Sequence, residues 1–143
     1  MIKKLIIQSL SAGALATIVS TLYTNFYYGK LIKDFSIADF SESVNIQTIL
    51  KYDFFAVLIG GLIFFVISKL IKNNAISNFV FNFLVSLICI TLVFGVLKMK
   101  DPVFKNEDAQ LFIDYYKGFL MPLLFVPALS WFTLKPLLIK SDD

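Results

Sequence analysis

The chain of 143 residues is strongly apolar: 58% of its residues are hydrophobic, only 16% are charged, and its mean hydropathy is +0.80. In soluble domains about a quarter of the residues are charged. We therefore interpret residues 1–143 as one integral membrane domain. All 13 basic residues are lysines and histidine is absent, which excludes histidine-ligated haem or zinc and Ser-His or Cys-His catalysis. With one cysteine and no phosphate-binding or nucleic-acid motif, we expect no cofactor, no metal, no catalytic residue and no nucleic-acid partner.

The first charge-free stretch contains the 25 residues between Lys4 and Lys30. A helix needs ~20 residues to cross the hydrocarbon core, so the stretch predicts a span over about 5–28. Its basic start also fits a secretory signal peptide, but Gln8 interrupts the apolar run, which continues to Tyr28, and we expect an uncleaved anchor. Small residues, which mark helix contacts in lipid, recur every four positions in two neighbouring rows: Ser9, Gly13, Thr17 and Thr21, and Ala12, Ala16, Ser20 and Thr24.

A second span is expected over about 50–71, although only 15 uncharged residues follow Asp53 before the next lysine. Fifteen helical residues reach about 22 Å, less than the ~30 Å of the hydrocarbon core, so we expect Asp53 to lie at the outer edge of the membrane. Its carboxylate then has two interpretations: an ion pair with Lys51 or Lys117, or an ionisable site for a proton, a cation or an amine. The span also carries small residues suited to helix packing, Ala56 and Gly60.

A third span over about 76–98 follows from the 25 uncharged residues between Lys72 and Lys98. It carries polar residues at the spacing of one helix face, Asn78, Asn82 and Ser86. Polar side chains inside a span are costly in lipid and mark contacts or functional paths. Packing inside the bundle is one interpretation of this stripe, and the lining of a path through an oligomer is the other.

A short interfacial helix is expected over about 106–117, before the last span. Asn106 is suited to cap its start and Gly118 to end it. Its charged residues Asp114 and Lys117 offer a site at the outer leaflet. Aromatic residues near its end are expected at the level of the lipid headgroups: Tyr115, Tyr116 and Phe119.

The last span, expected over about 118–138, holds three prolines. Pro122 falls in the predicted first turn, where a missing N–H has no partner to lose. Pro136 falls at the membrane edge. Pro127 is then the internal proline, and because it removes a backbone donor it predicts a helix kink.

The charges near the spans predict the orientation of the chain. Four spans place both termini on one side of the membrane. The basic segments 1–4 and 69–74 contain no acidic residue, whereas the two long loops balance their lysines with acids. The positive-inside rule therefore predicts both termini in the cytoplasm.

The segment VPALSWFTLKPLLIK, residues 126–140, resembles a group of small uncharacterised four-helix integral membrane proteins of Gram-negative bacteria. The resemblance covers about a tenth of the chain and is specific at four positions: Pro127, Trp131, Lys135 and Pro136. It implies four helices and a location in the bacterial inner membrane, and it implies no activity.

Together these features predict an all-α, four-helix transmembrane bundle with little soluble mass. Because no catalytic constellation is present, we interpret the chain as a non-enzymatic accessory or assembly subunit of a larger membrane complex. Its partners would be the lipid bilayer and either a protein subunit or a second copy, docked on the small faces of the first two spans. Two alternatives stay open: an oligomeric small transporter or channel that uses Asp53 and the stripe on the third span, and a lipid-binding protein or membrane enzyme that acts through Asp114 and Lys117.

Overall fold

The computed structural model describes residues 2–28 and 39–138 of the chain. Across these residues the fold is all-α, with no strand. Its helices are α1 (Ile2–Phe26), α3 (Ile46–Leu70), α4 (Asn74–Lys98), the short α5 (Glu107–Leu111) and α6 (Ile113–Leu138). The four long helices are each apolar enough to cross a membrane, and 25 residues at ~1.5 Å per residue exceed the ~30 Å of the hydrocarbon core. The predicted four-span membrane architecture is confirmed.

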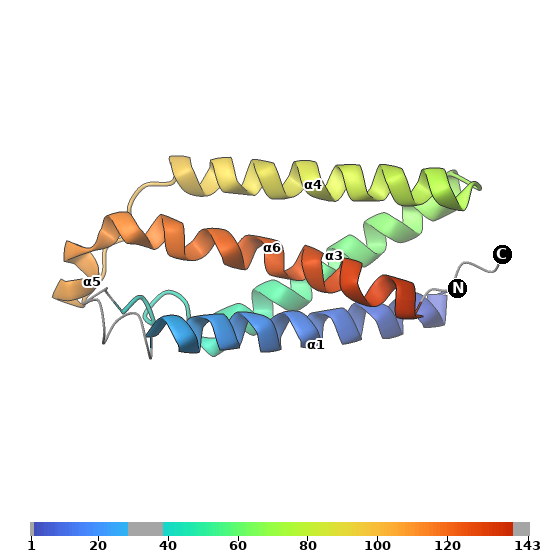
Figure 1. The fold of residues 1–143 in the computed structure, drawn as a ribbon. Coiled ribbons are helices and arrows are strands. Elements are labelled where there is room, and N and C mark those ends of the chain that lie inside the picture. The colour runs from blue at the N-terminus through green and yellow to red at the C-terminus, as the bar shows by residue number, and fades with distance from the viewer. Residues whose placement is uncertain (1, 29–38, 139–143) are drawn as a thin grey trace.

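The bundle has a three-helix centre with a fourth helix on its outside. α1 packs against both α3 and α6, while α4 packs against α3 and α6 from the other side. Figure 1 shows α3 crossing obliquely behind α6, with α1 and α4 on opposite sides. The start of α1, the turn from α3 to α4 and the end of α6 lie at one end of the bundle, and α5 lies at the other. Only 11% of the α4 span is buried, against 28% for α3 and 33% for α1 and α6.

Asparagine side chains cap the N-termini of three of the helices. Asn45 accepts a hydrogen bond from the Thr48 amide at 3.0 Å at the start of α3. Asn73 does the same for the Ile76 amide at 3.1 Å at the start of α4. Asn106 accepts from the amide of Asp108 at 2.9 Å at the start of α5. Each bond satisfies a backbone donor that the first helical turn leaves free. The cap predicted at Asn106 is confirmed.

The interfacial helix is shorter than the predicted range 106–117. It ends at Leu111, and the last long helix begins at Ile113. Phe112 lies between the two helices with a non-helical backbone conformation, φ −102° and ψ 28°. Gly118, expected to end the interfacial helix, lies inside α6. The prediction failed because a glycine ends a helix only where the chain turns there, and here residues 113–117 continue into the span.

The early start of α6 changes the position of its prolines. Pro122 is an internal residue of the helix rather than a first-turn residue, and Pro136 also lies inside it, since α6 extends to Leu138. The helix is therefore continuous through all three prolines (Figure 1). Each proline leaves one backbone carbonyl without its usual donor. The kink expected at Pro127 stays a prediction.

Close contact between α1 and α3 depends on glycine. A Cβ atom on Gly61 would lie 2.5 Å from the Ser9 hydroxyl, and one on Gly13 would lie 2.9 Å from the Phe54 ring. Thr17 is only half-buried and bonds to the carbonyl of Gly13 in its own helix at 3.0 Å. A Cβ atom on Gly60 would meet nothing within 4 Å. The small face of α1 is thus occupied by this chain's own α3 and α6, and it is not free to dock a partner.

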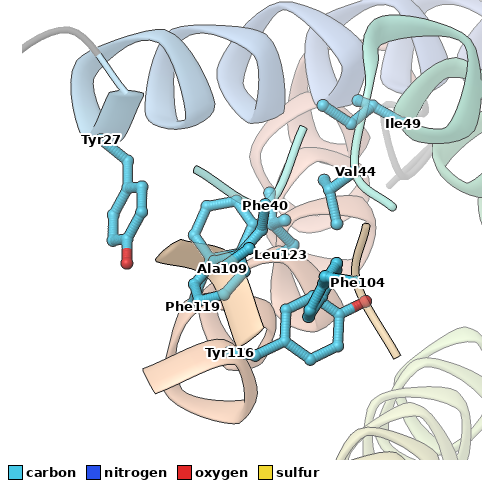
Figure 2. Packing of buried hydrophobic residues seen from close by; sticks show 9 residues of the cluster. All are labelled: Tyr27, Phe40, Val44, Ile49, Phe104, Ala109, Tyr116, Phe119 and Leu123. Atoms are coloured by element: carbon cyan, nitrogen blue, oxygen red, sulfur yellow. The ribbon is translucent and has the colours of Figure 1, made fainter. Parts of the chain in front are cut away.

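Aromatic side chains close the bundle at the end that carries α5. This loop-end cluster is buried and joins the end of α1, the segment before α3, the start of α3, the loop before α5, α5 itself and α6. Figure 2 shows its members: Tyr27, Phe40, Val44, Ile49, Phe104, Ala109, Tyr116, Phe119 and Leu123. Phe40 is fully buried, and its ring centroid lies 5.1 Å from that of Tyr116 and 5.4 Å from that of Phe104. Tyr116 and Phe119, expected at the headgroups, are buried in the cluster, while Tyr115 is exposed.

Polar contacts tie the two loops together beside the cluster. The Glu42 carboxylate accepts hydrogen bonds from the backbone amides of Lys105 at 3.0 Å and Asn106 at 3.2 Å. The Tyr28 hydroxyl donates to the Val44 carbonyl at 3.0 Å. Burial and the neighbouring Tyr23 raise the pKa of Tyr27 to about 12. The loop end is therefore a packed cap on the bundle.

Candidate functional site

The carboxylate of Asp53 lies inside the bundle. Its side chain is 1% exposed, and it follows the start of α3 by two helical turns, about 10 Å. Neither carboxylate oxygen has a hydrogen-bond partner among the described residues. The Ser20 hydroxyl of α1 lies beside it as a potential donor to the carboxylate, although among the described residues the two groups fall short of full hydrogen-bond geometry. An isolated buried carboxylate is very costly, so this site must hold a proton or bind a positively charged group.

The ion pair proposed for Asp53 does not form. Lys117 pairs instead with Asp101, at 2.9 Å between Nζ and Oδ1. Lys51 is exposed, whereas Asp53 is buried. The two residues are separated by two positions in α3, and side chains at that spacing do not lie on the same helix face. The alternative prediction, an ionisable site, stays open for Asp53.

A cavity of about 190 Å³ lies beside Asp53 between α1, α3 and α6. Hydroxyl-bearing residues contribute to it at Ser20, Ser43 and Thr48, and most of its remaining wall is aliphatic or aromatic carbon. The loop-end cluster supplies part of this wall through Val44, Ile49, Tyr116 and Leu123. The cluster therefore positions the cavity as well as closing the bundle.

An apolar groove of about 260 Å³ lies between α3, α4 and α6. Ala56 and Gly60, predicted to pack against another helix, line this groove instead, with Pro127 and the buried Cys89. Tyr52 lines both the groove and the Asp53 cavity, and its hydroxyl donates to the Leu124 carbonyl at 3.5 Å. Tyr52 and Leu124 thus line both spaces.

The polar stripe of α4 faces away from Asp53. Asn78 is half-buried, and Asn82 and Ser86 are exposed on the lipid-facing surface. The Ser86 hydroxyl donates to the Asn82 carbonyl of its own helix at 2.9 Å. None of the three lines the Asp53 cavity. Within one chain, therefore, the stripe and Asp53 do not form one path.

The two charged residues expected to form a site at the outer leaflet, Asp114 and Lys117, do not contact the same group. Asp114 is exposed in the first turn of α6, where a carboxylate favours the helix dipole. Lys117 is engaged with Asp101. Partly exposed pairs of this kind contribute about 0–1 kcal/mol, so the contact between Lys117 and Asp101 adds little stability.

Two buried polar side chains were not recognised as site residues from the sequence. Gln8 is 0% exposed with both amide atoms lacking a partner, and the Trp131 indole N–H also lacks one, among the residues that the structure describes. Ser20 was assigned only to a packing row. The available signal was that Gln8 is an amide between apolar residues in the first half of the span, which predicts an inward-facing position.

Comparison with known proteins gives no family. No protein-family model matches the chain, and no curated protein or solved structure is significantly similar to it. The resemblance of residues 126–140 to small four-helix proteins of Gram-negative bacteria stays a prediction. The described residues also contain no cluster of three or more metal-ligating side chains. The candidate site is thus defined by its geometry: one buried carboxylate beside a mostly apolar cavity.

Proposed function

We propose that the chain is a non-enzymatic accessory or assembly subunit that docks within the membrane on a larger complex through α4. The observation that carries this proposal is the low burial of α4, 11% of its span, together with the outward position of Asn82. Lipid offers an amide no hydrogen-bond partner, so a contact that supplies one is favourable by about 0.6–2 kcal/mol. The small face of α1 is used within the chain, while Ala56 and Gly60 of α3 line the groove beside α4, which leaves the outer surface of α4 as the docking face.

The proposed location is the bacterial inner membrane with both termini in the cytoplasm. The basic segments 1–4 and 69–74 support the orientation through the positive-inside rule. In this orientation the loop-end cluster lies at the outer face of the membrane. A tag accessible only from the cytoplasm at Met1 and only from outside at Lys105 would support it.

Affinity purification of the tagged chain at native expression in a mild detergent tests the docking proposal. We expect fixed amounts of partner subunits with the wild type and their loss with Asn82→Leu. Asn25→Leu is the matched control, because Asn25 is also an exposed asparagine but lies on α1, and it should retain the partners. A partner-free monodisperse wild-type chain would contradict the proposal. A species that contains only copies of this chain would remove the larger complex and leave α4 as a self-interface.

A second candidate function is an oligomeric small transporter or channel. Asp53 favours it, because a buried carboxylate without a partner among the described residues is typical of substrate and ion pathways in membrane proteins. The measurement is flux of small cations into proteoliposomes that contain the purified chain. We expect Asp53→Asn to abolish a flux that the wild type supports. Absence of wild-type flux would remove this candidate.

A further inference from the structure

The Asp53 cavity combines one concentrated negative charge with a wall made mostly of carbon. Both oxygens of the carboxylate and the neighbouring Ser20 hydroxyl lack hydrogen-bond partners within residues 2–28 and 39–138. These groups line the cavity, and the Ser20 hydroxyl can accept from a ligand as well as donate to the carboxylate. A ligand that pairs with the ionised carboxylate must therefore donate hydrogen bonds and carry positive charge.

An inorganic cation fits this space poorly. Ca²⁺ takes about six to eight oxygen ligands, and Mg²⁺ requires near-octahedral geometry. The described cavity offers one carboxylate and a few hydroxyl groups, and the described part of the chain has no group of three or more His, Cys, Asp or Glu side chains that could hold a metal ion. The aliphatic wall of Leu120, Leu123 and Leu124 would lie against such an ion without compensating its lost hydration.

We propose that this cavity binds a small organic ammonium ion, with Asp53 as its counter-ion. Three N–H donors of a primary ammonium suffice for the two carboxylate oxygens and the Ser20 hydroxyl. Its alkyl group would contact the leucine wall, and the aromatic rings of Tyr52 and Tyr116 that line the same cavity favour a cation near their faces. A volume of about 190 Å³ corresponds to roughly six water-sized groups at ~30 Å³ each, which suits an amine of a few carbons.

This inference names a ligand class for the second candidate function, on which it builds, and it is independent of docking through α4. Binding is measured on the purified full chain without a membrane gradient. A chain that binds the ammonium ion and carries no flux would support the site while removing the transporter. Loss of partner subunits in Asn82→Leu does not bear on it.

Thermal unfolding of the full chain in a neutral maltoside detergent tests the site, with n-propylammonium chloride as the probe. We expect a saturable increase in Tm, because a ligand that binds only the folded state stabilises it. Sodium chloride at equal ionic strength should produce no such increase. Asp53→Asn should abolish the increase, and Ser20→Ala should shift it to higher propylammonium concentrations.

Asp114→Asn is the matched control, because it removes an exposed carboxylate from α6 and should leave the response unchanged. An equal increase in Tm with sodium would overturn the choice of an organic cation. An increase that persists in Asp53→Asn, or no increase in the wild type, would overturn the site itself. Because Asn has nearly the same shape as Asp and removes a buried charge, the variant is expected to fold.

Discussion

Helices α1 and α4 have the same length of 25 residues, but α1 is packed between other helices and α4 is mostly exposed to lipid. α4 has the higher mean hydropathy and is the less buried of the two. The buried positions of α1 are small or polar, including Ser9, Ala12, Ala16 and Ser20, whereas α4 buries only Ser77, Phe81 and Cys89. Lipid is as apolar as leucine, so hydrophobicity does not drive helices together in a membrane. Close approach and polar contacts do, and the less hydrophobic helix of the two is therefore the one that belongs to the three-helix centre.

The comparison predicts that α4 is held by very few side chains. Phe81 is 1% exposed, and its ring centroid lies 5.1 Å from that of Phe64 and 5.9 Å from that of Trp131. Phe81→Ala is expected to cost about 3–5 kcal/mol, measured as the free energy of unfolding in detergent. Phe79→Ala, at a position 70% exposed on the same helix, should be nearly neutral. Equal effects of the two would contradict the outer position of α4.

The central helices should instead be sensitive to added volume. Gly61→Val would place atoms against Ser9, where a Cβ already lies 2.5 Å from the hydroxyl, and we expect a loss of about 1–3 kcal/mol. Gly60→Val is the neighbouring control, since its Cβ would meet nothing within 4 Å. The measurement is again unfolding in detergent. If Gly60→Val is the more damaging variant, the contact between α1 and α3 is wrongly placed.

Removal of the buried charge should stabilise the centre of the bundle. In the absence of ammonium ions and at a pH high enough to ionise Asp53, Asp53→Asn is expected to raise the free energy of unfolding by on the order of 1 kcal/mol, because an unpaired charged group costs more to bury than a neutral one. Asp114→Asn, at an exposed position, should change it by less than about 0.5 kcal/mol. A clear loss of stability in Asp53→Asn would mean that the carboxylate has a favourable partner.

The smallest effect is expected just beyond the span of α1, in the loop-end cluster. The pKa of Tyr27 is raised by burial to about 12, above the ~10 of an unfolded tyrosine. The unfolded state therefore loses this proton first, and stability is retained below about pH 10 and lost as the pH rises toward 12. Tyr27→Phe should weaken this alkaline decrease in Tm and change little at pH 8.

The control for Tyr27 is Tyr115→Phe, because Tyr115 is 58% exposed on α6. The Tm of the Tyr115→Phe variant should decrease with rising pH as much as the Tm of the wild type does. If Tyr27→Phe also matches the wild type, the loop-end cluster does not hold the Tyr27 hydroxyl away from water.

The sequence located the four spans and missed several of their contacts. Residues 76–98 were predicted within two residues of α4, because a charge-free stretch of that length has one stable conformation in lipid. The polar face of the same helix was assigned without knowing which side its neighbours occupy. Asn82 and Ser86 accordingly entered a hypothetical path with Asp53, although they face outward. A repeat of four residues marks a face but does not name its partner.

The sequence predicted features correctly where they depend on interactions between residues close together in the chain. Asn106 begins α5 as predicted, because the cap is a bond between residues two apart. Helix termination was less predictable: Phe112 rather than Gly118 separates α5 from α6. The break at Phe112 coincides with the packing of Ala109 and Tyr116 into the loop-end cluster, whose other members come from distant parts of the chain.

The sequence by itself determined that this protein is a four-span membrane bundle, because span length and apolar composition are properties of each segment and of the bilayer thickness. Only the tertiary structure decided the environment of Asp53. The sequence is equally compatible with an ion pair and with a buried cavity, because both place Asp53 at the same position in α3. The distinction depends on α1 and α6, which enclose the carboxylate, and on Asp101, which engages Lys117. Those contacts join residues far apart in the chain, and they turn a charge expected at the membrane edge into a site inside the bundle.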